Sequence, residues 1–338
     1  MRRVVIPRYG TPDVLEVREA PDPTPGTGEI RIAVAAAGVN FADILGRLGL
    51  YPDAPRPPFT PGYEVCGTVD AVGAGVDEWR AGDRVVALTR FGGYATSVVV
   101  PATLAFRTPS ALSDVEGAAL PVNYLTALVA LYKFANLDAG ETVLIHSAAG
   151  GVGIAATQLA RLRGATIIGA ASSAKHEALR AFGVDYPIDY RKVDVVAEVR
   201  RLTNGRGVDV ILDSIGGGSF ADSYSLLAPL GRLALYGVSS IAPGTKRSWW
   251  RAVRTVLSMP KFKPLSLMNR NRGVFGINLA HLWGETDQLR KAMRLLLEEA
   301  GRGRIRPVIA KTYPLDQAAE AHRFIQSRSN VGKVVLLT

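Results

Sequence analysis

The sequence predicts an α/β protein in which a doubly wound parallel sheet is joined to a β-rich domain. From about Leu120 onward, short apolar stretches alternate with amphipathic stretches of helical period, which is typical of parallel β-α-β units with right-handed crossovers. A glycine-rich turn, AAGGVG at 148–153, separates one such strand from the helix after it. The first third of the chain is instead a series of short β-like runs between glycine and proline turns.

The predicted elements follow from these patterns. In the β-rich part we expect strands at 29–36, within 63–76, at 83–89 and at 94–101, with a long loop at 51–62. The α/β part contains predicted strands at 142–147, 166–172, 185–190, 208–216 and 232–240, and predicted helices at 154–164, 175–183, 194–205 and 220–231. A helix at 287–303, a strand at 306–314, a helix at 316–327 and a strand at 332–337 close the chain. Because this ending resembles the β-rich part, we expect one domain of 1–122 completed by 306–338, and a second of 123–305.

The composition and charge of the chain exclude some classes of protein. Of the 338 residues, 48% are hydrophobic and 21% charged, as in ordinary globular proteins, and no apolar run is long enough to span a bilayer. The first ten residues turn polar too early for a signal peptide, so we expect a cytoplasmic protein. Cys66 is the single cysteine, and the four histidines lack ligand spacing, so we predict no metal. The net charge of +10 favours polyanionic partners without choosing among them.

The glycine-rich turn is either part of a nucleotide-binding site or only a tight turn between a strand and a helix. A diphosphate requires backbone N–H groups and the positive end of a helix dipole close by. Set against the GxGxxG pattern, Ala148 takes the first place, Gly150 the second and Gly153 the third. A glycine-rich turn alone is a weak signal, but a predicted strand precedes this one and a predicted helix follows it. The sequence therefore predicts a bound dinucleotide.

The end of the next strand indicates which dinucleotide binds. An NAD-preferring site places an acid about twenty residues beyond the loop, where it accepts hydrogen bonds from the ribose. This chain has Ser173 and Lys175 there, and Tyr190 with Arg191 at the end of the following strand. Hydroxyls and a cation suit a 2′-phosphate, so we predict NADPH. The alternative is that Ser173 only caps an ordinary helix, and the two roles are compatible.

With these motifs, the chain resembles the zinc-independent quinone oxidoreductase branch of the medium-chain dehydrogenase/reductase superfamily, and within it the VAT-1-like proteins. The resemblance covers essentially the whole chain, and its marks are GVNFADILGRLGLYP (38–52), PGYEVCGTV (61–69), AGDRV (81–85), NYLTA (123–127), AAGGVG and NVGKVVL (330–336). It implies a Rossmann domain and a GroES-like catalytic domain. It also implies a homodimer whose sheet continues across the two-fold axis through the strand at 274–279.

Two departures from zinc-containing members of the superfamily bear on the chemistry. Asn40 and Tyr63 stand where those proteins carry a cysteine and a histidine, so the resemblance implies zinc-independent catalysis. Without a Lewis acid, alkoxide stabilisation is lost, and hydride transfer to an electron-poor acceptor remains. We therefore predict an NADPH-dependent oxidoreductase that acts on quinones or α,β-unsaturated carbonyls. A biosynthetic enoyl reductase is an alternative with the same chemistry.

The resemblance also assigns roles to individual residues. The cofactor-binding set is Asn40, Thr126, Ala149, Gly150, Gly151, Val152, Ser173, Lys175, Tyr190, Gly237, Phe275, Ile277 and Asn330. We expect Asn40 and Tyr51 to hydrogen-bond the developing oxyanion, with Tyr51 or solvent supplying the proton. The expected substrate pocket contains Tyr51, Tyr63, Trp249 and Trp250. The alternatives are that Tyr51 is only a loop aromatic and that Asn40 is only a turn or cap residue.

A basic, tryptophan-containing segment at 245–272 has no assigned role. No acidic residue occurs between Asp222 and Glu285, whereas eight lysines and arginines lie within the segment. It can form an amphipathic helix on an anionic membrane or a flap over the substrate pocket, and we favour the flap. The membrane reading corresponds to a second function, that of a VAT-1-like lipid-associating protein with little turnover. No nucleic-acid recognition module is present, so we expect no nucleic-acid partner.

Overall fold

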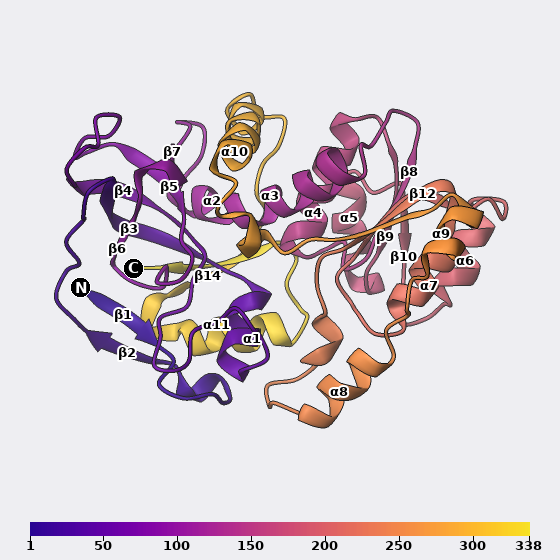
Figure 1. Ribbon diagram of the computed structural model, residues 1–338, viewed down its shortest axis with the longest axis horizontal. Helices are drawn as coiled ribbons and strands as arrows, with labels where there is room; N and C mark the ends of the chain where they lie inside the picture. Colours follow the sequence, from indigo (N-terminus) through magenta and orange to yellow (C-terminus); the bar gives the residue numbers. More distant parts are fainter. The chain divides into compact units, whose positions relative to one another are not determined.

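The computed structural model describes residues 1–338, and the chain divides into two compact units, each with its own sheet (Figure 1). The first unit contains Met1–Leu125, Gly244–Arg247 and Leu279–Thr338. The second contains Thr126–Pro243 and Ser248–Asn278. No helix combines the length and the apolar composition that crossing a bilayer requires.

A long strand, β3 (Glu29–Val39), organises the sheet of the first unit. Its residues alternate between buried apolar side chains and partly exposed ones until the last four, which are all buried. β3 pairs with three antiparallel neighbours, and the sheet order is β14 (Ile309–Pro314), β15 (Lys333–Leu337), β3, β4 (Glu64–Val72), β5 (Arg84–Leu88) and β7 (Ala105–Arg107), with β6 (Ser97–Pro101) also on β3. A separate hairpin joins β1 (Arg2–Val5) to β2 (Glu16–Glu19). The C-terminal strands β14 and β15 therefore belong to this sheet.

Five helices belong wholly or partly to the first unit: α1 (Phe41–Leu48), α2 (Asp114–Ala119), α3 (Pro121–Leu128), α10 (Thr286–Gly301) and α11 (Ala318–Gln326), together with short 3-10 turns at Pro12–Val14, Ala102–Leu104, Leu279–Leu282 and Leu315–Gln317. α2 begins at a capping box, in which the Ser113 hydroxyl accepts from the Glu116 N–H and the Glu116 carboxylate accepts from the Ser113 N–H. α3 continues into a π-helical turn at Val129–Phe134 in the second unit.

The structure differs from our expected domain boundary at 306. Residues 279–305, including α10, group with the first unit rather than with the α/β part. Arg290 on α10 donates to Glu78 and to the Thr103 carbonyl, both in the β-rich part. These contacts are made across the surface by residues about 190 to 210 positions apart, so the sequence pattern gives no sign of them.

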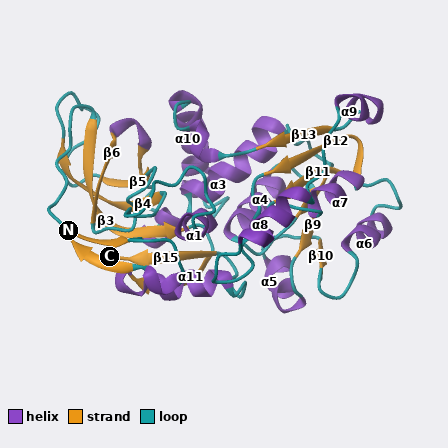
Figure 2. Cartoon of the chain, turned by 60° about the horizontal axis from the view of Figure 1, so that its bottom comes forward, coloured by secondary structure: helices purple, strands orange, loops and turns teal.

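The second unit contains a six-stranded parallel sheet in the order β10 (Tyr186–Ile188), β9 (Thr166–Ala170), β8 (Thr142–Ile145), β11 (Val208–Asp213), β12 (Leu227–Leu235) and β13 (Gly273–Gly276). All six residues of β11 are buried, which is expected for a central parallel strand covered on both faces. Figure 2 shows helices flanking this sheet: α4 (Gly151–Leu162), α5 (His176–Ala181), α6 (Val195–Leu202) and α7 (Ser219–Ser225), with α8 (Trp249–Leu257), α9 (Pro264–Arg270) and 3-10 turns at Ser173–Lys175 and Ser239–Ile241.

One predicted helix is shorter than expected. We predicted a helix over 220–231, but α7 ends at Ser225 and β12 already begins at Leu227. Pro229 cannot continue a helix, and Leu230 adopts a positive φ of 63°. Leu227 pairs with Val208, and an irregularity in the register lets the rest of β12 align from Arg232. Tertiary pairing therefore overrides the helical pattern of this stretch.

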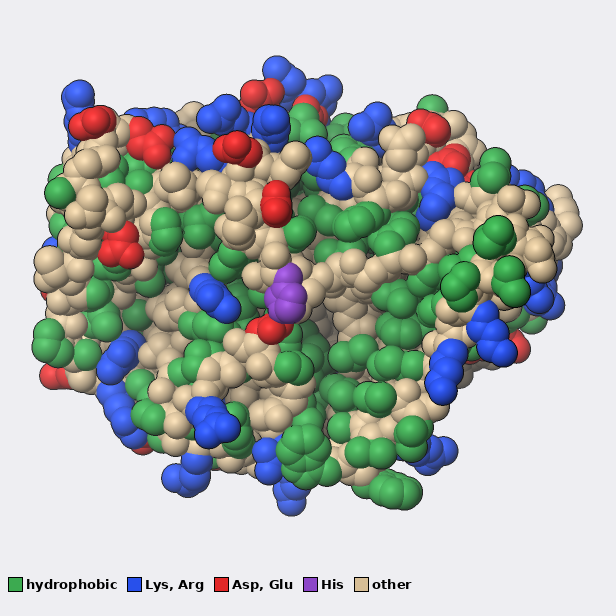
Figure 3. Space-filling model, viewed as in Figure 1, with side chains coloured by type: hydrophobic (Ala, Val, Ile, Leu, Met, Phe, Trp, Pro, Cys, Tyr) green, Lys and Arg blue, Asp and Glu red, His purple; other side chains and the backbone are tan.

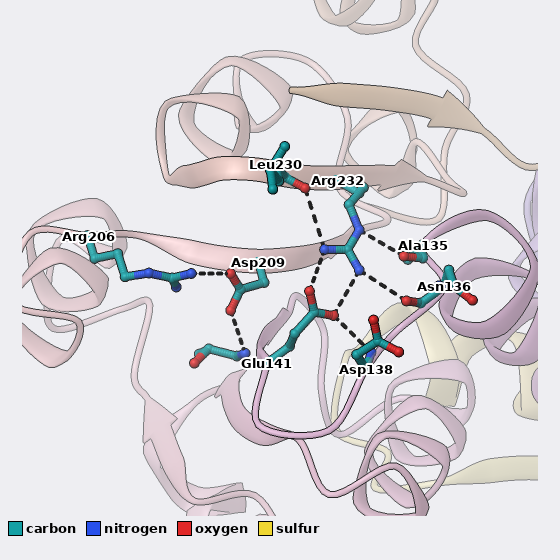
Figure 4. A network of polar contacts seen from close by, with 9 residues as sticks. Ala135, Asn136, Asp138, Glu141, Arg206, Asp209, Leu230 and Arg232 are labelled. Atoms are coloured by element: carbon teal, nitrogen blue, oxygen red, sulfur yellow. Dashed lines mark hydrogen bonds and ion pairs between the residues drawn. The ribbon is translucent and has the colours of Figure 1, made fainter. Parts of the chain in front are cut away.

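An ion-pair network ties together the amino ends of β8, β11 and β12 (Figure 4). Arg232 donates to both carboxylate oxygens of Glu141, at 2.6 and 2.8 Å, and to the Ala135 carbonyl at 2.8 Å. Asp209 accepts from Arg206 at 2.6 Å and from the Thr142 N–H at 2.9 Å. Every one of these charges therefore has a protein partner at this end of the sheet.

Candidate active site

The glycine-rich turn lies at the carboxyl end of β8, opposite the ion-pair network. Ser147 has a φ of 53°, which is uncommon for a residue other than glycine. Gly150 is the N-cap of α4, and its N–H bonds to the Ser147 carbonyl at 2.8 Å. The N–H groups of the first helical turn, at 151–153, have no acceptor within the helix. They are available to an anion, and the helix dipole favours one there.

The structure explains each position of the glycine fingerprint. A Cβ on Gly153 would lie 2.5 and 2.6 Å from the carbonyl oxygens of Ser147 and Ala148, so only glycine allows this close packing of helix on loop. Ala148, the departure from the usual pattern, is fully buried, and its methyl group would lie 3.0 Å from a Cβ placed on Gly169 of β9. The alanine therefore fills space beneath the loop and leaves the phosphate-facing side open.

The predicted 2′-phosphate residues meet at the ends of β9 and β10. Lys175 is half-buried, and its pKa is lowered by that burial and then by the positive charge of Arg191. The Arg191 guanidinium lies 5.8 Å from the centre of the Tyr190 ring. Two cations and a phenol are thus brought together, with the exposed Ser173 at the start of the same turn. An additional phosphate would offset the repulsion between the two cations.

An acid that the sequence patterns do not reveal also lies at this position. Asp189 closes β10, but its carboxylate is directed at backbone N–H groups, accepting from Arg191 and from Ser173, each at 3.0 Å. The hydrogen bond from the Arg191 N–H holds the pKa of Asp189 below its usual value. This carboxylate shapes the loop that carries the cations. Because it serves the backbone, it differs from the ribose-binding acid of NAD sites.

Three loops converge at the carboxyl ends of the central strands. The Ser214 hydroxyl donates to the Ser147 hydroxyl at 3.3 Å, and a Cβ on Gly237 would lie 3.2 Å from Ser214. Gly237, predicted as a cofactor residue, therefore borders the glycine-rich turn. Sequence reasoning did not select Ser147 or Ser214. The backbone strain at Ser147 is apparent only in the structure.

A buried polar network lies beneath these loops. His146 Nε2 is 3.0 Å from the Ser223 hydroxyl, and Ser223 and Ser219 each donate to Asp213 at 2.7 Å. Burial lowers the pKa of His146, against the opposing effect of Asp213. Although histidine, serine and aspartate occur together here, Ser223 is almost fully buried and its hydroxyl donates its hydrogen bond to Asp213. The network fixes strand ends to α7 and offers no nucleophile.

The remaining predicted residues of the second unit have varied surroundings. Thr126 on α3 is almost fully buried, and Ile277 follows β13 with its N–H bonded to the Leu235 carbonyl at 2.8 Å. Phe275 stacks on Phe134, with ring centres 4.9 Å apart. The two tryptophans of α8 are exposed, Trp249 at 58% and Trp250 at 76%, so neither is buried against the fold of its own unit. Their placement in a substrate pocket stays a prediction.

In the first unit, Asn40 is the N-cap of α1 and belongs to a buried cluster. Its side-chain oxygen accepts from Lys333 Nζ at 2.6 Å, and its Nδ2 donates to Glu64 Oε1 at 2.9 Å. Lys333 and Glu64 form an ion pair at 2.5 Å, and both are nearly or fully inaccessible to solvent. Asn40 therefore takes the N-cap position of α1, in a capping box with Asp43, and its amide also bonds to residues of β4 and β15. Asn330, three residues before Lys333, donates to the Gly332 carbonyl.

Asp43 fixes the start of α1 from within the helix. Its carboxylate accepts from the N–H groups of Asn40 and Gly62, both at 2.8 Å, and from the Tyr94 hydroxyl at 3.0 Å. Burial raises the pKa of Asp43 to about 6, against these three hydrogen bonds. The backbone around Asn40 is therefore held from two sides.

The predicted pocket aromatics of the first unit lie together. Tyr51 and Tyr63 meet edge to face, with ring centres 6.3 Å apart, and Tyr63 contacts Phe91 at 5.1 Å. Phe91 in turn packs on Phe59 at 5.8 Å. Neither phenylalanine was predicted, because both lie in loops whose path the sequence does not specify. Burial raises the pKa of Tyr63, so its phenol stays protonated.

No group of three or more histidine, cysteine, aspartate or glutamate side chains is arranged to hold a metal ion. Burial raises the pKa of the Cys66 thiol to about 12, so the protein's one cysteine is a buried, protonated thiol. Asn40 and Tyr63 supply an amide and a protonated phenol, neither of which is a preferred zinc ligand.

Comparisons with known proteins cover both units. Residues 26–110 match the alcohol dehydrogenase GroES-like domain family, and residues 182–336 match the zinc-binding dehydrogenase family. The synaptic vesicle membrane protein VAT-1 homolog of Homo sapiens is 41% identical over 340 residues, covering 100% of this chain and 86% of that protein. The structure of Escherichia coli quinone oxidoreductase complexed with NADPH is similar with a TM-score of 0.89 and 30% identity over 100% of both chains. That of CurK enoyl reductase is similar with a TM-score of 0.86 and 29% identity, covering 99% of this chain and 98% of the other.

Proposed function

The chain belongs to the medium-chain dehydrogenase/reductase superfamily, close to the VAT-1 homologues, and from this premise we propose that it is a zinc-independent reductase. Its substrates would be NADPH and a quinone or α,β-unsaturated carbonyl. The observation that carries the proposal is the pairing of an open glycine-rich turn with the cations Lys175 and Arg191. The glycine-rich turn suits the diphosphate, which both NADPH and NADH contain. The two cations suit the 2′-phosphate, which only NADPH contains.

When bound, the nicotinamide ring would supply the hydride. The chain's own residues would bind the coenzyme and orient it and the acceptor. N–H groups at 151–153 would hold the diphosphate, and the cations beyond β9 and β10 would hold the 2′-phosphate. Asn40 and Tyr51 would donate hydrogen bonds to the oxygen that gains negative charge. Tyr51 or solvent would then deliver the proton.

The proposal is tested by titration and turnover. Calorimetry should register NADPH binding to the folded protein, with weaker binding of NADH. NADPH oxidation, followed at 340 nm against a panel of quinones, enones and enoyl thioesters, should show turnover with at least one class. Activity should survive dialysis against a chelator, because the proposed chemistry uses no zinc. Absence of NADPH binding would reject the proposal, and a preference for enoyl thioesters would favour the biosynthetic enoyl reductase.

A second candidate function, association with anionic membranes, is supported by the surface of α8. Hydrophobic and basic side chains lie side by side at the bottom of Figure 3, where α8 lies in Figure 1. The exposed apolar residues of this helix are Trp249, Trp250, Val253, Val256 and Leu257. Its basic residues are Arg251 and Arg254, and the helix contains no acid. An exposed apolar face with flanking cations and no acid is suited to an anionic lipid surface.

Vesicle sedimentation separates this function from the reductase. The protein should sediment with vesicles containing phosphatidylserine and remain in solution with phosphatidylcholine alone. The double variant Trp250→Ser and Leu257→Ser should lose most of this binding, while Leu230→Ser, which changes an equally exposed leucine on β12, should retain it. Vesicle binding without turnover on any acceptor would place the membrane function first.

The quaternary proposal concerns β13. It is the edge strand of the parallel sheet and pairs only with β12. An edge strand can continue a sheet into a second copy of the chain. We propose a homodimer formed through 274–279. Light scattering should give twice the chain mass, and a monomer would exclude it.

A further inference from the structure

The buried cluster of Asn40, Glu64 and Lys333 is assembled by strand register. β15 runs antiparallel to β3 with Val334 opposite Val39, and β3 runs antiparallel to β4 with Ala37 opposite Val65. The end of β3 and the beginnings of β4 and β15 therefore lie at one end of the sheet. Residues up to 293 positions apart in sequence meet there within hydrogen-bonding distance.

The neighbours dictate which way the Asn40 amide faces. An ammonium has only donors, so it requires the amide oxygen, and Lys333 Nζ lies 2.6 Å from Oδ1. A carboxylate has only acceptors, so it requires the amide nitrogen, and Glu64 Oε1 lies 2.9 Å from Nδ2. The reverse orientation would set donor against donor and acceptor against acceptor. The orientation of Asn40 thus follows from the chemistry of its two partners.

The rest of the domain is built around this cluster. The second oxygen of Glu64 accepts from the Val122 N–H at 2.7 Å, so both carboxylate oxygens are bonded. A Cβ on Gly38 would lie 2.5 Å from Glu64 Oε1, which accounts for the glycine two positions before Asn40. A buried ion pair is costly to desolvate, and an apolar replacement is often as stable. A gain in stability is therefore a weak explanation for this buried pair.

We propose that Lys333 is a positioning residue for the reduction and that, together with Glu64, it fixes Asn40 as a hydrogen-bond donor; this rests on the proposed function. One Nδ2 hydrogen is used by Glu64, and the amide oxygen is used by Lys333. The group that Asn40 has left to offer is its second N–H. A fixed donor stabilises an oxygen that gains negative charge, as the carbonyl oxygen of the acceptor does when the adjacent carbon or the β-carbon receives hydride.

The test removes the ion pair while keeping the site neutral. In the double variant Glu64→Gln with Lys333→Met, the two charges of the ion pair are removed together, and the buried Asp43 carboxylate keeps its hydrogen bonds from Asn40, Gly62 and Tyr94. No ammonium then requires the Asn40 oxygen to face position 333. We expect kcat to fall about 100-fold with little change in KM, since a donor displaced by about 1 Å costs that much. The Kd for NADPH, measured by fluorescence, should change less than twofold. The single variant Lys333→Arg, which keeps a donor-only group beside Glu64, should have a higher kcat than the double variant and a lower kcat than the unaltered protein.

The matched control makes the same two chemical changes on the exposed face of α10, Glu298→Gln with Lys291→Met, and should leave both kcat and Kd unchanged. Asn40→Ala should lower kcat similarly, and adding it to the ion-pair variant should cause no further loss. Losses that multiply, or an unchanged kcat in the folded ion-pair variant, would overturn the positioning role. If the unaltered protein does not bind NADPH, the proposed function itself fails and the inference fails with it.

Discussion

The two ends of the six-stranded parallel sheet use polar residues in opposite ways. At the amino end, Arg232, Glu141, Asp209 and Arg206 satisfy one another and the adjacent backbone. At the carboxyl end, the turn before α4 holds Ser147 at positive φ and leaves first-turn N–H groups without intrahelical acceptors. The sheet is the same at both ends. What differs is whether its polar groups are already paired.

This difference follows from the geometry of parallel β-α-β units. At the carboxyl ends of the strands, the chain enters helices by their amino termini, so N–H groups and positive dipole ends gather there. At the amino ends, helices deliver their carbonyl oxygens, and Arg232 accordingly bonds the Ala135 and Asn136 carbonyls that follow the π-helical turn. One end is thus suited to anions, and the other is closed by salt bridges. We expect changes at the first end to alter binding and changes at the second to alter stability.

The largest effect is expected from Gly153→Ala at the carboxyl end. The new Cβ would lie within 2.6 Å of two backbone carbonyl oxygens, which cannot move without shifting the phosphate-binding turn. We expect the Kd for NADPH to rise at least 100-fold, since the displacement is about 1 Å. Isothermal titration measures it. Gly218→Ala, at a position where a Cβ meets nothing within 4 Å, is the control, and equal affinities for the two variants would contradict the assignment.

Arg232→Met tests the amino end. It leaves the Glu141 carboxylate partly buried without its partner, so we expect a loss of about 2–3 kcal/mol in unfolding free energy. The Kd for NADPH should stay within twofold of the unaltered protein. Urea unfolding and NADPH titration on one preparation give both values. The paired variant Glu141→Gln with Arg232→Met should lose less stability. A large change in the Kd for NADPH would contradict the expectation that changes at the amino end alter stability and not binding.

Lys175→Ala sharpens the comparison within the carboxyl end. Removing a half-buried cation from a phosphate should raise the Kd for NADPH about tenfold or more. The Kd for NADH should hardly change, because NADH has no 2′-phosphate. Fluorescence titration of both coenzymes compares them. Arg180→Ala, an exposed cation on α5, should alter neither. Equal losses for NADPH and NADH would count against the 2′-phosphate site.

The smallest effect is a difference in pH response. Burial keeps His146 neutral with a lowered pKa, so below the unfolded value of about 6.5 the unfolded chain binds a proton that the folded chain does not. Stability should therefore fall as pH drops through that range. His146→Gln should reduce the slope. The remainder combines a loss from His322, which burial also keeps neutral, with an opposing gain from Asp43, whose raised pKa of about 6 lets the folded chain bind a proton in the same range.

The amino end should respond only at lower pH. For Asp209, burial raises the pKa, but hydrogen bonds from Arg206 and the Thr142 N–H outweigh it and lower the pKa below 3.8. Its contribution to stability is present above that value and is lost as pH falls through the folded pKa. Asp209→Asn should therefore leave the slope between pH 5 and 6.5 unchanged. Urea midpoints measured across pH check both residues.

Local patterns were enough to predict much of the fold and part of the site. Alternating apolar runs and amphipathic stretches predicted the five parallel strands from β8 to β12 and the helices between them, and the resemblance added β13 as the sixth. The glycine turn predicted the N-terminus of α4, because glycine positions and helix starts are local properties. The sequence could not predict Asp189 as a backbone ligand or the aromatic neighbours Phe59 and Phe91. Their roles depend on loops whose paths are set by contacts with distant residues.

The sequence by itself therefore determined the alternation of strands and helices from β8 to β12, the glycine-rich turn and the basic residues beyond it, since each depends on residues close together in the chain. Only the tertiary structure decided that α10 joins the first unit, that Leu227 pairs with Val208, and that Asn40 lies between Lys333 and Glu64. Those outcomes depend on strand register and side-chain packing between residues tens to hundreds of positions apart. The sequence does not show whether a charged residue will be buried or which distant residue will pair with it. The fold determines both.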